Sequence, residues 1–314
     1  MLDVAAIAIG IALLFSGGEL LVRNASALAR VWGLSPMVVG LTIVAFGTSS
    51  PELAASLTAT LQGSPQIALG NVVGSNIANI ALVLALVALV QPPRATASFL
   101  RREVPIMVGA SALLVVVLVG GVVGRAEGAL LLLLLVAYLL LLLRRGEETS
   151  AVREEFAQAY GGPARRSTWM AVLLVVVGLA LLVGGANVLV VGATSLARGF
   201  GLPEMVIGLT LVAVGTSLPE LATSLVAAAK RQPDIALGNI VGSNIFNVLG
   251  IVGATAVTRP LRVPFEVVAI DLWVMLGLSV LLVPFLVSGL RLGRREGAVL
   301  VALYVGYVAY LYLA

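Results

Sequence analysis

The sequence predicts an all-α polytopic membrane protein of ten transmembrane helices, built as two inverted five-helix repeats with broken helices 2, 3, 7 and 8 at its centre. Three observations predict this fold. The 314 residues are 60% hydrophobic and 11% charged, whereas a soluble domain is about 45–50% apolar and about 25% charged. Apolar runs long enough to cross a bilayer recur along the chain. The second half of the sequence also repeats the first.

The composition excludes several kinds of chemistry. The chain has no His and no Cys, which excludes HExxH zinc sites, Ser-His and Cys-His nucleophiles, haem held by His or Cys, Cys-ligated iron–sulfur clusters and disulfides. Any chemistry must use Asp, Glu, Ser, Thr, Asn, the backbone and water, and no cofactor is expected. The net charge of +4 comes mainly from arginines in short connections, which is typical of membrane topology rather than of a nucleic-acid partner.

Ten apolar runs approach the roughly 20 residues that a transmembrane helix needs. The first opens Met1-Leu2-Asp3 without a basic segment, so it is interpreted as a span and not as a signal peptide. The ten predicted spans lie near residues 3–30, 35–61, 65–91, 99–122, 126–143, 168–197, 203–229, 234–257, 265–288 and 297–314.

The basic residues predict the orientation of these spans. Fifteen of the 19 lysines and arginines fall in connections on one side, and four fall on the other. Because basic residues concentrate on the cytoplasmic side, both termini are expected outside the cytoplasm. Residues 145–167, the only long polar stretch, are expected to form a solvated cytoplasmic linker. They separate a first repeat, 1–144, from a second, 168–314. The expected location is the cytoplasmic (inner) membrane of a prokaryote, with the lipid bilayer as the surroundings. No protein partner is implied, so a monomer would suffice.

An internal repeat appears when the sequence is shifted by 168 residues. Residues 40–79 then align with residues 208–247 without a gap, and 27 of the 40 pairs are identical. Each half holds five spans, an odd number, so the second half must enter the membrane upside down. Inverted repeats with matching interrupted helices are typical of secondary transporters, whose substrate binds near the midplane at the repeat interface.

The interruptions lie in the motifs GTSSPE (47–52) and GTSLPE (215–220). Proline removes a backbone donor and clashes with the preceding turn, so the backbone carbonyls around 45–48 and 213–216 are expected to lose their helical partners. Unsatisfied backbone inside a membrane is tolerated only where protein or a polar cavity covers it. The predicted helix-breaking residues are Gly47, Pro51, Gly215 and Pro219.

Polar side chains share helix faces with two intramembrane glutamates. An intramembrane carboxylate is costly and therefore indicates function. Helical spacing places Thr48 and Ser49 beside Glu52, and the second repeat places Thr216 and Ser217 beside Glu220. In the third and eighth spans the motifs GSNIAN and GSNIFN add a further set on their own faces: Ser75, Asn79, Ser243 and Asn247.

If these faces converge, they form a site of hard oxygen donors. Calcium takes about 6–8 oxygens and accepts carboxylates bidentately, and two carboxylates cancel its charge. Magnesium fits less well because it keeps its water in a strict octahedron, and soft transition metals prefer ligands that this chain lacks.

Simpler interpretations were weighed for each motif. The GTSxPE segments could be plain proline kinks with the glutamate paired to an arginine, but neither copy has an arginine nearby in its span. Gly70, Gly74, Gly238 and Gly242 are expected to allow tight helix packing. Asn76 and Asn244 could be ligands or could brace the broken helices, and Glu19 is expected to pair with Arg23 four residues later.

The paired motifs GTSSPE with GNVVGSNIAN, and GTSLPE with GNIVGSNIFN, resemble the two α-repeats of the cation/Ca²⁺ exchanger superfamily, closest to prokaryotic Na⁺/Ca²⁺ exchangers. The resemblance covers the whole architecture. It implies that Glu52 and Glu220 are ligands shared by Ca²⁺ and Na⁺ and that Thr48 and Thr216 give backbone carbonyls to Ca²⁺. It also implies that four serines and two carbonyls complete flanking Na⁺ sites: Ser49, Ser75, Ser217, Ser243, Ala45 and Ala213. The first and sixth helices would slide across the remaining core.

One position departs from the family pattern. Well-known members carry Asp where this chain has Asn247, opposite an Asn where it has Asn79, so this chain has one titratable group fewer in the site. The departure leaves Ca²⁺ binding intact and leaves the number of Na⁺ ions open.

The sequence therefore predicts a Ca²⁺/Na⁺ antiporter and not an enzyme. The alternatives are a Ca²⁺/H⁺ exchanger that uses the same carboxylates, a cation channel, and an intramembrane aspartyl-type hydrolase.

Overall fold

The computed structural model describes residues 2–32, 34–146, 168–200 and 213–313. The predicted linker 145–167, apart from its first two residues, and the first part of the predicted seventh span lie outside the described residues. The described chain is almost entirely helical, as expected. Here η denotes a π-helical segment, in which hydrogen bonds skip five residues instead of four.

The first repeat contains a long helix, a bent pair, a long central span and two further helices. Its elements are α1 (Leu2–Trp32), α2 (Pro36–Val39), η1 (Gly40–Val44), α3 (Ala45–Thr48), α4 (Ser50–Leu61), α5 (Pro65–Ala78), η2 (Asn79–Leu84), α6 (Ala85–Val90), α7 (Ala97–Leu118), β1 (Val122–Val123) and α8 (Arg125–Gly146).

The second repeat follows the same order. Its described elements are α10 (Thr168–Gly199), α12 (Ala213–Thr216), α13 (Leu218–Ala229), α14 (Pro233–Phe246), η4 (Asn247–Val252), α15 (Gly253–Thr258), β2 (Leu261–Arg262), α16 (Phe265–Val287) and α17 (Arg294–Leu313).

Six described helices are long and apolar enough to cross a membrane, and the bent pair Met37–Thr48 and Ser50–Leu61 makes a seventh span. Helices α7 and α17 have 22 and 20 residues, enough for a bilayer core of about 30 Å at 1.5 Å per residue. Three consecutive charged residues lie near the start of each helix, residues 101–103 in α7 and 294–296 in α17. The α12–α13 pair occupies the position of the remaining predicted span.

The two most buried spans form the centre of the molecule. Within the model, 78% of the window in Pro65–Val90 and 83% of the window in Pro233–Thr258 are buried, against 28–33% for the four other long spans. Each central span begins with proline at the start of its helix, where the missing donor costs nothing. Both widen into a π-helical segment at an asparagine, Asn79 or Asn247. The interruption predicted in spans 3 and 8 therefore takes the form of a π-helical segment inside a continuous helix.

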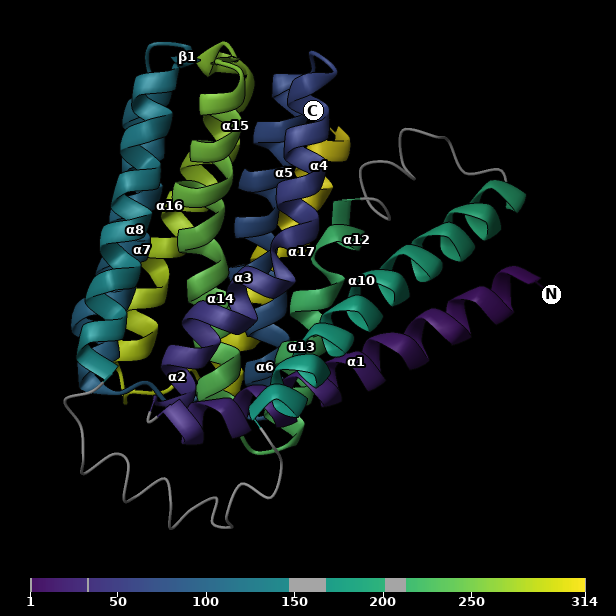
Figure 1. Cartoon of the computed structure of the whole chain (residues 1–314). Helices are drawn as coiled ribbons and strands as arrows, with labels where there is room; N and C mark the ends of the chain where they lie inside the picture. Colours follow the sequence, from purple (N-terminus) through teal and green to yellow (C-terminus); the bar gives the residue numbers. More distant parts are fainter. Residues whose placement is uncertain (1, 33, 147–167, 201–212, 314) are drawn as a thin grey trace.

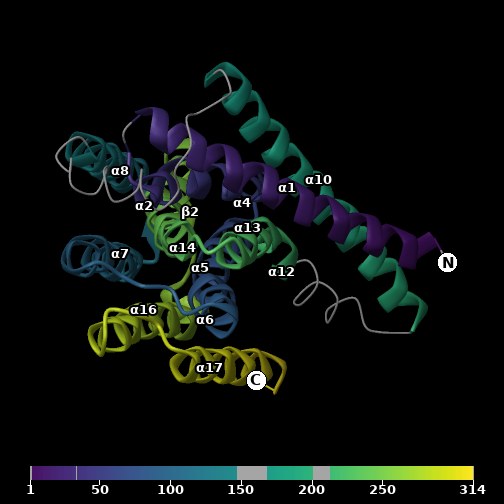
Figure 2. The same cartoon turned by 90° about the horizontal axis from the view of Figure 1, so that it is seen from below.

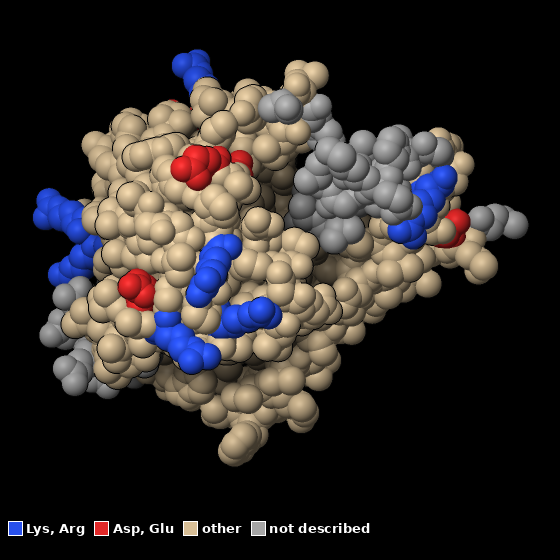
Figure 3. All heavy atoms as spheres, turned by 90° about the horizontal axis from the view of Figure 1, so that it is seen from above, with Lys and Arg blue, Asp and Glu red and all other residues tan. Residues whose placement is uncertain are grey.

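Short backbone pairings join the repeats at both ends of the molecule. At one end, which we call the β face, β1 pairs antiparallel with β2. At the opposite end, which we call the linker face because α8 ends and α10 begins there, Arg94 bridges to Arg291. The two contacts exchange under the 168-residue shift, so the repeats are related as an inverted pair. Seen from the β face, charged side chains are few and scattered over a largely uncharged surface (Figure 3).

Helices α1 and α10 pack along one another on one side of the core, with α17 on the other side (Figures 1 and 2). Glycines bring their backbones together. A Cβ at Gly17 would lie 2.8 Å from the Gly178 carbonyl, and a Cβ at Gly185 would lie 2.8 Å from the Leu14 nitrogen. Close approach through small residues is how transmembrane helices associate in the absence of a hydrophobic driving force between them.

Candidate cation site

The helix breaks lie at Ser49 and Ser217, one in each repeat. Both residues have the same irregular backbone, with φ/ψ of −84°/4° and −88°/5°, and the first break bends its span by 42°. Pro51 and Pro219 begin the next helix, where proline is well tolerated. The predicted breaks are thus present, two residues before each proline.

Gly47 and Gly215 do not themselves break the helix, contrary to expectation. Both lie inside helical segments, α3 and α12. A Cβ at Gly47 would meet the Leu179 side chain of α10 at 2.6 Å, and Gly215 faces Val190 of the same helix. The absence of a side chain therefore serves the close approach of α10 to both breaks.

Glu52 and Glu220 occupy the first turns of the helices that follow the breaks, and both are completely buried. The first turn of a helix is its electropositive end, which is why a carboxylate is best tolerated there. Ser49 of the first repeat donates a hydrogen bond to Glu220 Oε1 of the second, at 3.0 Å. The two repeats therefore meet at this hydrogen bond.

Four asparagines form a hydrogen-bonded ring across the repeat interface. Asn79 Nδ2 donates to Asn244 Oδ1 and Asn247 Nδ2 donates to Asn76 Oδ1, both at 3.0 Å. The side chains of Asn76 and Asn244 each donate to the other's backbone carbonyl at 3.3 Å. Asn76 and Asn244 therefore brace the two central spans against each other and orient the amides of Asn79 and Asn247.

The orientation of these amides leaves acceptor oxygens without hydrogen-bond partners. Among the described residues, five buried oxygens of the glutamates and of the two outer asparagines of the ring have none: Glu52 Oε1 and Oε2, Glu220 Oε2, Asn79 Oδ1 and Asn247 Oδ1. A buried acceptor with no donor costs free energy, and a buried carboxylate costs far more. All five are hard oxygen donors of the kind that Ca²⁺ and similar cations bind.

The hydroxyl groups predicted for the site lie around this cluster. Ser217 donates to Ser75 at 3.3 Å across the repeat interface, while Ser243 Oγ is buried with no partner in the described part of the chain. Thr48 is fully buried and Thr216 is partly buried. The predicted residues of each repeat are therefore brought to the same interface.

One backbone expectation is wrong. The Ala45 carbonyl accepts the Ser49 N–H at 3.0 Å, so it keeps its helical partner. The physical reason is spacing: Pro51 deprives the carbonyl four residues earlier, at position 47, and not the one at position 45. The Thr48 hydroxyl also lies 3.4 Å from the same carbonyl oxygen. Ala213 is the first residue described in its span.

Sequence reasoning missed four residues that support the site: Asn71, Asn239, Ser56 and Ser224. The two asparagines are the first Asn of each GNxVGSN motif. Asn71 Nδ2 donates to Ser56 Oγ, and Asn239 Nδ2 donates to Ser224 Oγ, both at 3.0 Å. Each pair has the same residue type at equivalent positions of the two repeats, as the predicted ligands also do. This repetition was the available signal.

Two further expectations concern packing and pairing. Tight packing is confirmed for Gly238 and Gly242, where a Cβ would lie 2.6 Å and 2.7 Å from carbonyls of Met37 and Leu41. No described atom lies within 4 Å of such a Cβ at Gly70 or Gly74, but the counterparts of Met37 and Leu41 in the second repeat lie outside the described residues. Glu19 forms its ion pair with Lys230, at 2.6 Å, and not with Arg23, because α13 brings the lysine to it.

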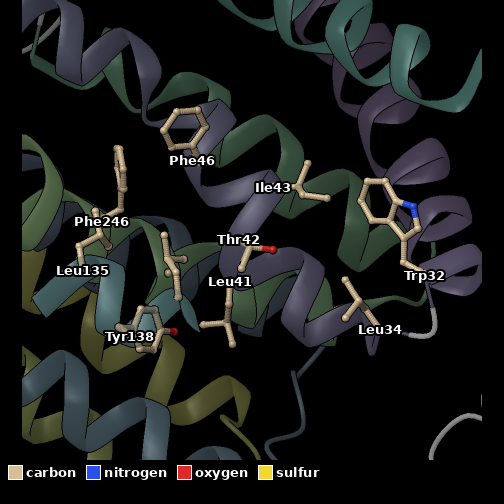
Figure 4. Close-up of a pocket in the computed structure, with 11 residues that line it drawn as sticks. Trp32, Leu34, Leu41, Thr42, Ile43, Phe46, Leu135, Tyr138 and Phe246 are labelled. Carbon is tan, nitrogen blue, oxygen red and sulfur yellow. The ribbon is translucent and has the colours of Figure 1, made fainter. Parts of the chain in front are cut away.

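A cavity of about 350 Å³ lies beside the site between α1, η1, α8 and α14 (Figure 4). Its lining is apolar apart from the Thr42 and Tyr138 hydroxyl groups, and it includes Trp32, Phe46 and Phe246. The Thr42 hydroxyl is already used by the Val38 carbonyl. The cavity offers no carboxylate, so it is not part of the candidate cation site.

Comparison with known proteins agrees with this arrangement. The model of the family described as sodium/calcium exchanger protein matches residues 2–144 and 170–313. The putative antiporter CaxA of Alkalimonas amylolytica is 39% identical over 309 residues, covering 95% of each chain. The inner membrane protein YrbG of Escherichia coli is 36% identical, covering 99% of this chain and 97% of its own length. The solved structure of the sodium-calcium exchanger NCX_Mj is 30% identical, has a TM-score of 0.85, and covers 99% of both chains.

Proposed function

The chain belongs to the sodium/calcium exchanger family, and from this premise we propose that it exchanges Ca²⁺ for Na⁺ by alternating access. It is a multi-pass membrane cation exchanger and not an enzyme. Which cations it exchanges is the proposal. Under this proposal Ca²⁺ leaves the cell as Na⁺ enters down its gradient.

The observation that carries the proposal is the set of five buried oxygens on Glu52, Glu220, Asn79 and Asn247 that have no partner among the described residues. Two carboxylates and two amide carbonyls supply a formal charge of −2 and only acceptor atoms. A Ca²⁺ ion cancels this charge and accepts bidentate carboxylates within its 6–8 oxygen ligands. A proton would satisfy single carboxylate oxygens but would leave the oriented amide carbonyls without a partner.

The roles proposed for the individual residues are those that the resemblance to the exchanger family implies. Glu52 and Glu220 bind both Ca²⁺ and Na⁺, while the backbone carbonyls of Thr48 and Thr216 bind Ca²⁺. Asn79 and Asn247 supply neutral oxygens between the carboxylates. The flanking Na⁺ sites use the hydroxyl groups and carbonyls near the two breaks: Ser49, Ser75, Ser217, Ser243, Ala45 and Ala213.

Competition for the two carboxylates explains why the transport is coupled. Ca²⁺ and Na⁺ need the same two glutamates, so neither ion binds fully while the other is present. An occupied site is close to neutral, whereas the empty site carries two buried charges, which are expensive in a low-dielectric interior. The loaded protein can therefore change conformation and the empty one cannot, which converts binding into exchange.

We propose that the protein lies in a prokaryotic cytoplasmic membrane, with both termini and the β face outside and residues 145–167 in the cytoplasm. The arginine distribution supports this orientation. The printed name of the Escherichia coli relative, an inner membrane protein, supports the location.

The test is ion uptake by proteoliposomes. Vesicles loaded with Na⁺ are diluted into Na⁺-free medium at equal pH. A proton ionophore prevents a pH gradient, and valinomycin with symmetric K⁺ holds the voltage at zero. Radiolabelled Ca²⁺ uptake that requires internal Na⁺ is the expected result. Uptake driven by a pH gradient instead would make the protein a Ca²⁺/H⁺ exchanger and overturn the role given to Na⁺. Flux that neither saturates nor depends on a counter-ion would indicate a channel.

A further inference from the structure

Two asparagines outside the predicted ligand set join the repeats at their breaks. Thr48 Oγ1 of the first repeat lies 3.2 Å from Asn239 Oδ1 of the second, and Thr216 Oγ1 lies 3.3 Å from Asn71 Oδ1. The other end of each amide donates to a serine four residues after a glutamate, as described above. Each asparagine therefore connects the break of one repeat to the glutamate-bearing helix of the other.

We propose that Asn71 and Asn239 are positioning residues that hold the threonine of the opposite repeat in register with the carboxylates. The proposal rests on the proposed function, because the ion must use the groups around the break. The Thr48 hydroxyl is also 3.0 Å from the Val44 carbonyl in its own helix. The hydroxyl has a single proton, so its hydrogen bond to Asn239 competes with the one to the Val44 carbonyl. Removing Asn239 therefore leaves the hydroxyl a partner in its own helix.

A double-mutant cycle tests this role. Thr48→Val removes the hydroxyl but keeps the backbone carbonyl, and Asn239→Ala removes its acceptor. Each single variant should raise the Ca²⁺ concentration for half-maximal stabilisation about tenfold, the value of roughly one hydrogen bond. The double variant should be no worse than the weaker single variant. The matched control is Asn71→Ala with Thr48→Val, which should be additive because Asn71 contacts Thr216.

Ca²⁺-dependent thermal unfolding is the readout, since a merely structural role would lower the unfolding temperature without changing the Ca²⁺ dependence. Additive effects of Thr48→Val and Asn239→Ala would overturn the proposal. If Asn239→Ala does not fold, the same cycle is run with Asn239→Ser, which is too short to reach Thr48. Failure of Na⁺ coupling in the liposome assay would leave this cycle unaffected.

A separate observation concerns how α1 and α10 contact the core. At the linker face, Glu19 pairs with Lys230 at 2.6 Å and Ser26 Oγ lies 2.9 Å from Gln232 Oε1. Gly18 lets α1 approach α13, with Val226 3.2 Å from a Cβ placed there. We call the two side-chain contacts the linker-face latch.

The same positions in the other repeat make no such contacts. Under the 168-residue shift, Glu19 and Ser26 become Asn187 and Thr194, and Lys230 and Gln232 become Gln62 and Ser64. Thr194 Oγ1 is buried with no partner among the described residues. Thr58 of α4, the counterpart of buried Val226, is exposed. Helix α1 packs along α13, and among the described pairs α10 has no comparable packing against α4.

The geometry points to two alternative latches, of which this structure holds one. In the opposite conformation the α10 side closes on the β face, where Asn187 meets Gln62 and Thr194 meets Ser64. We call these contacts the β-face latch. The two latches differ in charge, because the linker-face latch has an ion pair where the β-face latch has two amides. The ion pair favours the conformation with the linker face closed, so it sets the resting state of the exchanger.

Paired cysteines test this directly, because the natural chain has none. The pair Ser26→Cys and Gln232→Cys reports the linker-face latch, and Thr194→Cys with Ser64→Cys reports the β-face latch. Disulfide formation is followed in proteoliposomes with Na⁺ and Ca²⁺ on both sides of the membrane, because only the loaded protein is proposed to change conformation. The readout then does not depend on which of the two ions is exchanged. The first pair should cross-link faster than the second, and both should cross-link in transport-competent protein.

The repeat itself supplies the matched variants. Glu19→Asn with Lys230→Gln gives the linker-face latch the residues of the other one. This change should slow the first cross-link and speed the second by about two- to fivefold, the value of an exposed ion pair. Asn187→Glu with Gln62→Lys should shift the rates in the same direction, and the charge-reversed pair Glu19→Lys with Lys230→Glu should restore the original rates. The inference is wrong if the β-face pair never cross-links in active protein, or if these exchanges change neither rate.

Discussion

Replacing Glu52 by glutamine separates two effects of the carboxylate: the free energy lost by burying it in the ion-free protein, and its contribution to Ca²⁺ binding. Both carboxylate oxygens of Glu52 are fully buried and have no partner among the described residues. Removing such a charge relieves an uncompensated burial penalty, and glutamine has nearly the same shape. We therefore expect the ion-free Glu52→Gln protein to unfold at the same temperature as the natural protein or at a higher one.

Ca²⁺ binding should be lost in the same variant. Two unit charges 4 Å apart at an effective dielectric constant of about 20 interact by about 4 kcal/mol. Because Ca²⁺ carries two charges, this value is a lower bound for the loss, and it corresponds to roughly a thousandfold weaker affinity. At 100 times the natural dissociation constant, Ca²⁺ stabilises the natural protein by about 2.7 kcal/mol. The variant, then at about one-tenth of its own dissociation constant, should gain about 0.06 kcal/mol by the same relation.

The assay is thermal unfolding in detergent as a function of Ca²⁺, with radiolabelled Ca²⁺ uptake in liposomes as the second measurement. Glu220→Gln should lose Ca²⁺-dependent stabilisation and Ca²⁺ uptake in the same way. The unfolding temperature of its ion-free form should change less, because Glu220 already accepts a hydrogen bond from Ser49. Glu127→Gln, at the exposed start of α8, is the matched control and should retain both signals. Wild-type-like uptake, or undiminished stabilisation by Ca²⁺, in either site variant would refute the central role of the carboxylates.

Three further predictions follow from individual contacts. Asn247→Asp should change the pH profile of Ca²⁺ uptake, because an ionised carboxylate cannot donate to Asn76 Oδ1 as the amide does; an unchanged profile would place Asn247 outside the site. Gly242→Ala should destabilise the protein by about 1–3 kcal/mol, since its Cβ would lie 2.7 Å from the Leu41 carbonyl. Gly109→Ala, at an exposed position of α7 with no described atom within 4 Å of its Cβ, should be neutral or stabilising by up to about 1 kcal/mol, and equal unfolding temperatures for the two alanine variants would contradict the packing argument. Ser49→Ala should weaken Ca²⁺-dependent stabilisation more than Ser50→Ala, because Ser50 donates only to the Phe46 carbonyl, and equal effects would argue against the Ser49–Glu220 contact.

The fold could be predicted because its determinants are local or periodic. Apolar runs identify the spans, and the 168-residue shift relates contacts that no single segment reveals, such as the bridge of Arg94 to Arg291 and the pairing of β1 with β2. The same symmetry predicts that the two copies of each motif lie at the repeat interface, and the contacts of Ser49 with Glu220, Asn79 with Asn244 and Asn247 with Asn76 cross that interface.

The contacts that were not predicted depend on tertiary packing between segments far apart in the sequence. Spacing alone paired Glu19 with Arg23, whereas the partner of Glu19 is Lys230, 211 residues away. Gly47 and Gly215 were expected to break their helices, whereas they lie inside helical segments and face α10. The roles of Asn71 and Asn239 depend on which side of a central span faces the opposite repeat, and neither hydropathy nor helical periodicity determines that.

The inverted repeat explains both what is symmetric in this molecule and what is not. The asparagine ring and the Thr–Asn–Ser connections recur in both repeats with nearly equal distances, since an ion approaching from either side must find the same ligands. The linker-face latch has no counterpart among the described contacts of the other repeat. Val226 of α13 is buried, whereas its counterpart Thr58 of α4 is exposed. A protein that closed both faces equally would release the ion to neither side. Under the two proposals made above, the symmetric contacts hold the ion site and the unequal contacts accompany the conformational change. Substitutions in the first group should alter ion affinity, whereas substitutions in the second should alter the balance between conformations at constant affinity.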